Sequence, residues 1–427
     1  MTDRPRPILV AFLIGLLAEA LFLWGLATPH MLVFDEIHYV PAARKLLALA
    51  GPVNTEHPLL AKEFIAAGIA LFGDNAFGWR FFSTLAGAAT VMGVFAILWL
   101  LYRRIRPALM GSIFALLNFT IYIEARIAML DGFFAAFTVG GIAALLWAMR
   151  APPEKVWRRW IVASVLLGLA VACKWAAAPY VAYAGIGFLI LRVRDARIAK
   201  RPLLAALSGK DQPHWAGLPA IPALAVLGLV SIATYFLTFA PAFFYADQPL
   251  TLATLLPFQQ TMWAEQVQVL PSHPYQSSWW SWPLLIRPIW YLYEPADGAM
   301  RGILMIGNPA ILWGGLLAVL ACLEGWLRDR NPKLLFAAAL WIASYAVWAV
   351  TPKSLGFFYY YYLPSIFLCI ELAAAFDHFC TGKWQHWDEA FAILAFGIAV
   401  YFFPIISAAP LPNGDAFQHW MWFSSWP

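Results

Sequence analysis

The sequence predicts an all-α protein that crosses a membrane many times. Of its 427 residues, 62% are hydrophobic and only 12% are charged, whereas a soluble domain carries about 25% charged residues. So few charges could not cover a surface exposed to water. The formal net charge of +5 is small for a chain of this length, and we therefore expect no nucleic-acid partner.

Eleven apolar runs approach the roughly 20 residues that a helix needs to cross the hydrocarbon of a bilayer. The first run follows Arg4 and Arg6 and has no convincing signal-peptide cleavage site, so we interpret it as a retained anchor. The runs cover residues 8–28, 79–101, 107–123, 132–149, 160–176, 177–191, 217–239, 303–327, 334–350, 356–376 and 390–407.

One shorter apolar stretch, residues 58–72, decides the topology. Lys62 and Glu63 interrupt it, so we expect it to lie at the interface or to re-enter the membrane rather than to cross. With the N-terminus inside and the C-terminus outside, 19 of the 28 Lys and Arg residues then fall on the inner face, as the positive-inside rule requires. If residues 58–72 crossed, every later segment would change sides and this bias would reverse.

The chain is expected to form one integral membrane domain, residues 1–427. Its outer segments are a first loop with interfacial helices at 29–78, a long loop at 240–302 and a short turn at 351–355. We find no internal repeat that would suggest a transporter with duplicated halves. The four cysteines show no CxxC spacing, so neither a disulfide framework nor a zinc site follows from them.

Polar residues collect on the predicted outer face, beginning in the first loop. Asp35 and Glu36 follow the first span directly, His38 comes next, and His57 and Lys62 lie further along. A carboxylate pair of this kind could simply mark the point where a helix leaves the lipid, so by itself it indicates little.

Other outer span ends repeat the pattern with cations and aromatic rings. A charge at the centre of a membrane helix costs about 2.5–3.5 kcal/mol, so each cation needs a reason, although any single one could be a snorkelling anchor. Together they predict a cationic, aromatic-lined cavity with carboxylates at its rim. Its residues are Arg126, Asp131, Lys174, His273, Tyr275, Trp279, Arg287, Lys353 and Tyr361.

Such a cavity suits a ligand that is anionic at the headgroup level and apolar elsewhere, as a polyprenyl phosphate sugar is. Arg binds phosphate oxygens bidentately and Lys adds a point charge. The same cations would stabilise the charge that grows on the phosphate as the sugar–oxygen bond breaks. A carboxylate could take the proton from an incoming hydroxyl, and a single carboxylate acting in this way predicts inversion at the anomeric carbon.

Three strings in order carry a resemblance to a known family. GLAVACKW (168–175), HPYQSSWWSWPLLIRP (273–288) and GNPAILWGG (307–315) resemble the protein O-mannosyltransferases that use a polyprenyl (dolichyl) phosphate mannose donor, which are GT-C glycosyltransferases. The similarity runs from FDEIHY near residue 34 to YYYYLPSIF near 367. It implies about eleven spans, a cytoplasmic N-terminus, and transfer of mannose to Ser or Thr hydroxyls of secreted proteins.

The resemblance also implies residue roles. Asp35 matches the catalytic carboxylate, with Glu36 beside it in the active site. The donor phosphate would be held by Arg126, Lys174, Arg287 and Lys353. The acceptor side would include His38, His57, Lys62, Asp131, His273, Tyr275, Trp279 and Tyr361. No cofactor is implied beyond the lipid-linked sugar. Asp35 and Glu36 could hold a divalent metal weakly, but nothing requires one.

The chain departs from the family pattern at three places. The usual His-Pro-Pro-Leu-Gly-Lys appears as HPLLAK, Tyr361 replaces a His in FYYYYLP, and the loop 240–302 has no room for the β-trefoil of the eukaryotic enzymes. The missing insert indicates a bacterial member in the inner membrane, with its active site on the periplasmic face.

Two alternatives remain open at this point. The acceptor could be a lipid or a polysaccharide, as in the aminoarabinose transferases. The protein could also be a transporter of polyprenyl lipids, but that function would need ionisable residues along a path through the bilayer. Only Glu19 and Glu371 lie well inside spans.

Overall fold

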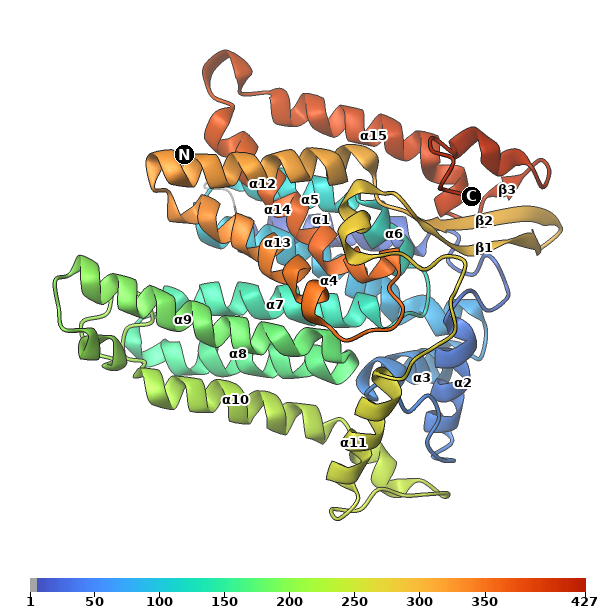
Figure 1. Cartoon of the computed structure of the whole chain (residues 1–427), viewed down its shortest axis with the longest axis horizontal. Coiled ribbons are helices and arrows are strands. Elements are labelled where there is room, and N and C mark those ends of the chain that lie inside the picture. Colours follow the sequence, from blue (N-terminus) through green and yellow to red (C-terminus); the bar gives the residue numbers. More distant parts are fainter. Residues whose placement is uncertain (1–5) are drawn as a thin grey trace.

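The computed structural model describes residues 6–427 and is mostly helical. The long helices lie side by side along the long axis of the molecule, and α1 begins at the end opposite to the chain's C-terminus (Figure 1). The α-helices are α1 (Pro7–Leu23), α2 (Glu36–Leu47), α3 (Leu60–Phe72), α4 (Ala76–Tyr102), α5 (Ile105–Leu116), α6 (Phe119–Glu124), α7 (Asp131–Met149), α8 (Pro153–Cys173), α9 (Ala178–Ile198), α10 (Ala220–Leu237), α11 (Leu255–Gln266), α12 (Pro309–Asp329), α13 (Pro332–Val350), α14 (Tyr362–Phe379) and α15 (Trp387–Ile406).

The bundle is that of an integral, multi-pass membrane protein. Within residues 6–427, nine helical stretches are long and apolar enough to cross a bilayer, and the shorter apolar helices α1 and α5 lie where the remaining two spans were expected. The total of eleven and the sides of the termini stay predictions. The third expected run is divided into α5 and α6 at Asn118, whose side chain accepts a hydrogen bond from the Thr120 amide and donates to the Ser365 carbonyl.

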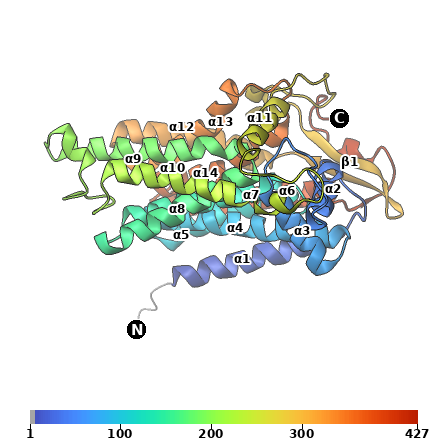
Figure 2. The same ribbon diagram turned by 90° about the horizontal axis from the view of Figure 1, so that it is seen from below.

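Helices α2, α3 and α11 gather at one end of the bundle (Figures 1 and 2). Residues 58–72 contribute α3, which has 13 residues and is therefore roughly 20 Å long, whereas the hydrocarbon is about 30 Å thick. It packs against α2 and α4. That this stretch lies at the interface or re-enters the membrane stays a prediction.

The same end carries a small antiparallel sheet that the expectation of an all-helical chain omitted. Strands β1 (Ile289–Ala296) and β2 (Ala299–Met305) form a hairpin, and β3 (Pro410–Leu411) pairs with β2. Asp297 and Gly298 both have positive φ at the turn, as a two-residue hairpin of right-handed twist requires. Residues 303–305 therefore belong to a strand, and the span expected from 303 begins instead as α12 at Pro309.

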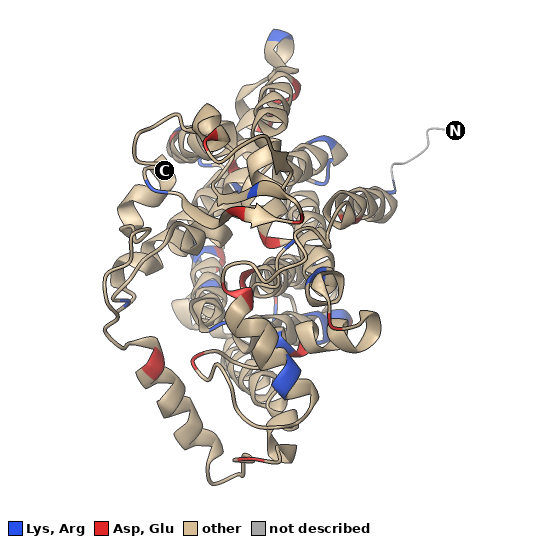
Figure 3. Ribbon diagram, turned by 90° about the vertical axis from the view of Figure 1, so that its right-hand side faces the viewer, with Lys and Arg blue, Asp and Glu red and all other residues tan. Residues whose placement is uncertain are grey.

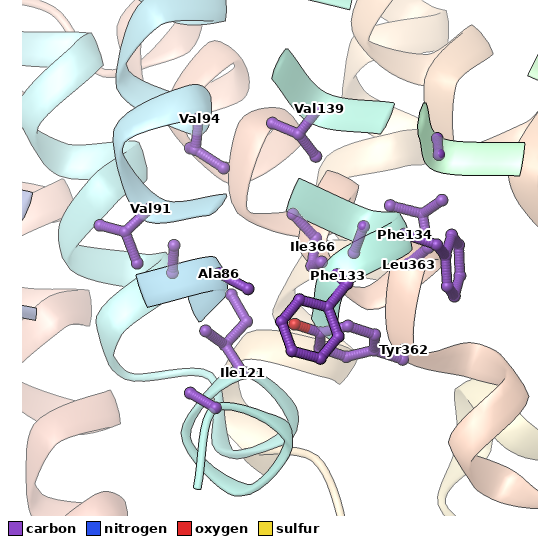
Figure 4. Close-up of a cluster of buried hydrophobic side chains, with 14 of the residues drawn as sticks. Ala86, Val91, Val94, Ile121, Phe133, Phe134, Val139, Tyr362, Leu363 and Ile366 are labelled. Atoms are coloured by element: carbon purple, nitrogen blue, oxygen red, sulfur yellow. The ribbon is translucent and has the colours of Figure 1, made fainter. Parts of the chain in front are cut away.

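A buried apolar cluster supports this end of the bundle from within (Figure 4). It joins Val91 and Val94 of α4, Ile121 of α6, Phe133 of α7 and Ile366 of α14, all of which are buried. Inside a bilayer, van der Waals packing rather than removal from water stabilises such contacts, and close packing leaves the helix ends little freedom. Phe133 belongs to this cluster and lies two residues after Asp131, the first residue of α7, so the packing fixes the start of that helix.

Close helix packing generates the first prediction, at Gly168 of α8. A Cβ atom there would lie 2.6 Å from the Ser231 carbonyl oxygen of α10, and small residues allow membrane helices to approach in this way. Gly168→Ala should therefore lower the free energy of unfolding by about 1–3 kcal/mol, measured by thermal unfolding in detergent. Gly187 of α9 has no atom within 4 Å of such a Cβ, so Gly187→Ala is the control and should cause no loss. If the two variants have the same free energy of unfolding, the close approach of α8 and α10 at Gly168 is contradicted.

Candidate active site

Asp35 lies at the start of α2, at the end of the bundle that carries the sheet, where acidic and basic residues surround the centre (Figure 3). Its backbone carbonyl accepts hydrogen bonds from the amides of His38 and Tyr39, which begin the helix. The Tyr39 hydroxyl donates to Asp35 Oδ2 at 3.3 Å. The side chain is half-buried. Burial raises its pKa from 3.8 to about 6, although Lys174 and His38 act in the opposite direction.

Lys174 and Asp131 form a buried ion pair next to Asp35. The Lys174 Nζ lies 2.9 and 2.7 Å from the two Asp131 carboxylate oxygens, and both side chains are almost fully buried. Lys174 follows the C-terminus of α8 and Asp131 begins α7, so each charge also complements its helix dipole. The Lys174 ammonium lies 5.3 and 5.5 Å from the ring centroids of Tyr359 and Tyr360, within cation–π range.

Glu124 and Tyr291 complete the buried side of this cluster. The Tyr291 hydroxyl donates to Glu124 Oε1 at 2.7 Å, and both residues are buried. The sequence analysis did not place Tyr291, Tyr359 or Tyr360 in the site. The run of four tyrosines was a visible signal for the last two, but Tyr291 lies on a strand that the sequence did not predict.

Glu36 has a different environment from its neighbour Asp35. It is fully buried, and Arg80 of α4 binds both of its oxygens, through Nε at 2.7 Å and Nη2 at 2.8 Å. The amides of Val33 and Ala128 donate to the same carboxylate, each at 2.8 Å. Four donors occupy the group completely, because a carboxylate has about four lone-pair sites. The structure thus gives Glu36 a role in holding the loop before α2, and its catalytic partnership with Asp35 stays a prediction.

Arg126 forms hydrogen bonds with the backbone at the C-terminal end of α1. Its guanidinium donates to the carbonyls of Phe22, Trp24 and Gly25 and lies over the Tyr122 ring, 5.1 Å from its centroid. Phe22 lies in the last turn of α1, and Trp24 and Gly25 follow the helix directly, so the guanidinium lies at the helix C-terminus, where a cation is favourable. The structure thus shows Arg126 capping α1, and its expected contact with the donor phosphate stays a prediction.

A network of hydrogen bonds ties three outer segments together. Lys62 is buried and donates to the carbonyls of Asn54 and His57, and burial lowers its pKa to about 7. Gln266 at the end of α11 contacts His57 Nδ1 at 3.1 Å and accepts from Lys353 Nζ at 2.6 Å. His57 and Lys62 also line a cavity of about 370 Å³ between the first loop and α11.

A larger cavity, of about 640 Å³, lies between the long loop and the turn that follows α13. Its lining includes Trp279, Arg287, Lys353 and Tyr360. Lys353 stays accessible, and partial removal from water together with repulsion by Lys174 lowers its pKa to about 8. Because Tyr360 also contacts Lys174, this cavity adjoins the Asp35 cluster.

Arg287 lines this cavity, but backbone carbonyls already occupy several of the guanidinium's hydrogen-bond donors. Its guanidinium donates to the carbonyls of Pro274, Ser425 and Pro427 and lies over the Tyr275 ring, 5.2 Å from its centroid. It therefore joins the long loop to residues 425–427.

The remaining expected site residues lie at various depths. His38 is exposed on α2, whereas His273 packs against Phe357 at the edge of the long loop. Trp279 is partly exposed beside Tyr345. Tyr361 is fully buried, and its hydroxyl accepts from Trp341 Nε1 at 2.7 Å, so it packs between α13 and α14 rather than toward Asp35. In the described part of the chain, no group of three or more His, Cys, Asp or Glu side chains could hold a metal ion.

A polytopic helical bundle with a half-buried carboxylate, an ion pair and aromatic rings at one end has the architecture of a membrane glycosyltransferase. Two family models match consecutive stretches of the chain. "Dolichyl-phosphate-mannose-protein mannosyltransferase" covers residues 41–245, and "C-terminal four TMM region of protein-O-mannosyltransferase" covers residues 251–426. The chain belongs to the protein O-mannosyltransferase family, which confirms the resemblance seen in the sequence.

Relatives of known name agree with this membership. A polyprenol-phosphate-mannose–protein mannosyltransferase of Mycobacterium tuberculosis is 29% identical, over 84% of this chain and 78% of its own length. One of the same name from Corynebacterium glutamicum is 25% identical, over 92% and 88%. An undecaprenyl phosphate-alpha-4-amino-4-deoxy-L-arabinose arabinosyl transferase of Sodalis glossinidius is 26% identical over 82% of this chain but only 55% of its own length.

Solved structures show the same fold. The Saccharomyces cerevisiae protein O-mannosyltransferase Pmt1–Pmt2 complex bound to the sugar donor has a TM-score of 0.80 at 14% identity, covering 100% of this chain and 93% of that one. ArnT from Cupriavidus metallidurans bound to undecaprenyl phosphate has a TM-score of 0.59 at 15% identity, covering 92% and 64%. The chain therefore has the fold shared by these glycosyltransferases.

The role of Glu36 can be tested through stability. Glu36→Gln leaves the Arg80 cation buried without its carboxylate, which should lower the free energy of unfolding by about 3–5 kcal/mol. The exposed pair of Arg44 and Asp74 offers a matched control, because Arg44 Nε also binds its carboxylate at 2.9 Å. Asp74→Asn should cost only about 1 kcal/mol or less. Thermal unfolding in detergent compares the two variants, and a Glu36→Gln protein as stable as Asp74→Asn would refute this role.

Proposed function

We propose that this protein transfers mannose from a polyprenyl phosphate mannose donor to Ser or Thr hydroxyls of secreted proteins, with Asp35 as the general base. One observation carries the assignment of the base. Of the carboxylates in the cluster, Glu36 is occupied by Arg80, and Asp131 by Lys174. Glu124 accepts from Tyr291 and is fully buried, so a substrate cannot reach it. Among the described residues, Asp35 accepts only the Tyr39 hydroxyl and stays half-buried. Its carboxylate is thus available to a substrate.

The chemistry requires one proton transfer and one displacement. The acceptor hydroxyl gives its proton to an Asp35 oxygen, and the hydroxyl oxygen attacks the anomeric carbon. The bond between that carbon and the phosphate oxygen breaks, and its electron pair stays on the phosphate. Because attack and departure take place on opposite faces of the sugar, the reaction inverts the anomeric carbon. A base with a pKa near 6 is well matched to a neutral medium.

Lys353 is the proposed ligand of the donor phosphate. It is accessible, lines the larger cavity and is close enough to Lys174 for each charge to affect the other. An anionic phosphate between these two ammonium groups would relieve their repulsion and take up charge as the sugar leaves. The tryptophans of the same cavity would contact the first isoprene units at the level of the headgroups.

A protein acceptor is preferred to a lipid acceptor. The named relatives that match most of their own length are protein mannosyltransferases, and the fold is closer to the yeast enzyme than to ArnT. A transporter is disfavoured because Glu371 is buried between helices and the Glu19 carboxylate accepts from Thr84 at 2.7 Å, so neither suggests a path across the membrane. We further propose that the site faces the periplasm of a bacterial inner membrane, as the charge bias supports.

The proposed base gives the next prediction. Asp35→Asn should lower kcat by about 100- to 10,000-fold, because an amide cannot accept the proton, while the protein still folds and binds the donor. Radiolabelled or mass-resolved transfer to a Thr-containing peptide measures kcat, and Asp297→Asn on the exposed hairpin is the control. In the wild type, kcat/KM for the donor should rise with pH through about 6, since the raised pKa of Asp35 leaves about a tenth of it deprotonated at pH 5. Undiminished turnover by Asp35→Asn would exclude the assignment.

The phosphate role of Lys353 predicts a separate kinetic effect. Lys353→Met should raise the KM for the donor by about 10-fold or more, which corresponds to a lost charge-assisted contact of about 1.5–3 kcal/mol. The KM for the peptide should change little. Lys45, an exposed lysine on α2, supplies the control variant Lys45→Met. If the two variants have the same KM for the donor, Lys353 is not the phosphate ligand.

A further inference from the structure

The residue before the proposed base has an unusual backbone conformation. Phe34 has φ of +51°, in the left-handed region that bulky side chains rarely adopt. Such residues persist only where the surrounding structure determines them, and they cluster at functional sites. Since Phe34 precedes Asp35 directly, its conformation sets the direction in which the Asp35 side chain leaves the start of α2.

Two aromatic side chains hold Phe34 in place. Its ring stacks on Tyr291 of β1, with centroids 4.1 Å apart and planes inclined by 12°. Tyr359 meets it from the edge, at 5.7 Å and 77°. The contact with Tyr359 has the edge-to-face geometry that aromatic rings favour, and the contact with Tyr291 is a close parallel stack. The backbone of the preceding residue is fixed as well, because Glu36 accepts the Val33 amide.

Tyr291 is in turn fixed by Glu124. The hydroxyl–carboxylate hydrogen bond of 2.7 Å orients the ring that faces Phe34. Glu124 is fully buried at the end of α6, and its second oxygen has no hydrogen-bond partner among the described residues. Burial of a carboxylate is unfavourable without compensation. The one hydrogen bond that this carboxylate does make is to the tyrosine behind Phe34.

We propose that Tyr291 and Glu124 are positioning residues for transfer: through the Phe34 ring they hold the left-handed backbone that aims the Asp35 carboxylate at the acceptor. This inference rests on the proposed function of Asp35. The β1–β2 hairpin would then influence the reaction although it is not part of the helical bundle. Its residue Tyr291 packs against Phe34 in the loop between α1 and α2.

The test separates the ring from its hydroxyl. Tyr291→Phe keeps the stack but loses the bond to Glu124, and it should lower kcat by about 3- to 10-fold, the range of a typical lost hydrogen bond. Tyr291→Leu removes the stack and should lower kcat by about 100-fold, as a small misplacement of a reacting group does. The KM values for donor and peptide should stay within about twofold of wild type in both variants, because neither substrate contact is removed.

Tyr293 provides a matched control on the same strand. Its hydroxyl also donates a hydrogen bond of 2.7 Å, to the Gly414 carbonyl and away from Asp35. Tyr293→Phe should therefore leave kcat unchanged. If Tyr293→Phe and Tyr291→Phe lose activity equally, or if Tyr291→Phe loses none, the positioning role is wrong.

Glu124 supplies the second readout. Glu124→Gln keeps an oxygen that can accept from the tyrosine and should retain most of kcat, whereas Glu124→Ala should match Tyr291→Phe. Because both changes break one bond, the double variant Glu124→Ala/Tyr291→Phe should be no slower than either single variant. Additive losses would overturn the proposal, and so would an equal loss in Glu124→Gln and Glu124→Ala.

The pH profile distinguishes positioning from a general loss of fold. A displaced Asp35 has a new environment, so the acidic limb of kcat/KM should move in Tyr291→Leu, whereas partial unfolding would lower the plateau without moving the limb. If Asp35→Asn is inactive while the variants of Tyr291 and Glu124 behave as wild type, only this inference fails. If Asp35→Asn is active, the proposed function fails first.

Discussion

The buried ion pair between Glu36 and Arg80 is the constraint on which the position of the site depends. It joins the start of α2 to α4, and the remaining Arg80 donors bind the carbonyls of Leu26, Pro29 and Met31 in the preceding loop. Charges removed from water in this way are tolerated only when every donor and acceptor is matched. Since Asp35 directly precedes Glu36 in the chain, fixing one residue fixes the backbone of the other.

Two adjacent carboxylates thus have opposite tasks, set by their surroundings rather than by their residue type. Glu36 points into the bundle and is saturated by four donors, whereas Asp35 points to the edge of the cluster and has one weak partner, Tyr39. Enzymes obtain distinct acid–base behaviour from similar groups through this kind of difference in environment. An acidic pair at the end of a span therefore need not be a catalytic pair.

The sequence predicted the helical fold well because its signals are local. Apolar runs mark the spans, whereas the placement of the 58–72 stretch stays a prediction. The same reasoning brought Asp35, Asp131 and Lys174 to one end of the bundle, where the structure also has them. It could not say which partner each charge would choose. Arg126 and Arg287 bind backbone carbonyls of distant segments, and no local pattern identifies a partner that lies more than 100 residues away.

The features that the sequence missed share a physical origin. The β1–β2 hairpin lies at the end of the long loop 240–302, and the last residues of its second strand, 303–305, run into the apolar stretch that predicts a helix. Tyr291 lies on the first strand, which has no signal in the sequence, although its side chain bridges Glu124 and Phe34. A membrane enzyme of this kind must build its site where helices end, and there the unsatisfied backbone groups and desolvated charges find partners from all parts of the chain. The spans can therefore be predicted from local composition, whereas the site requires the full set of long-range contacts between their ends.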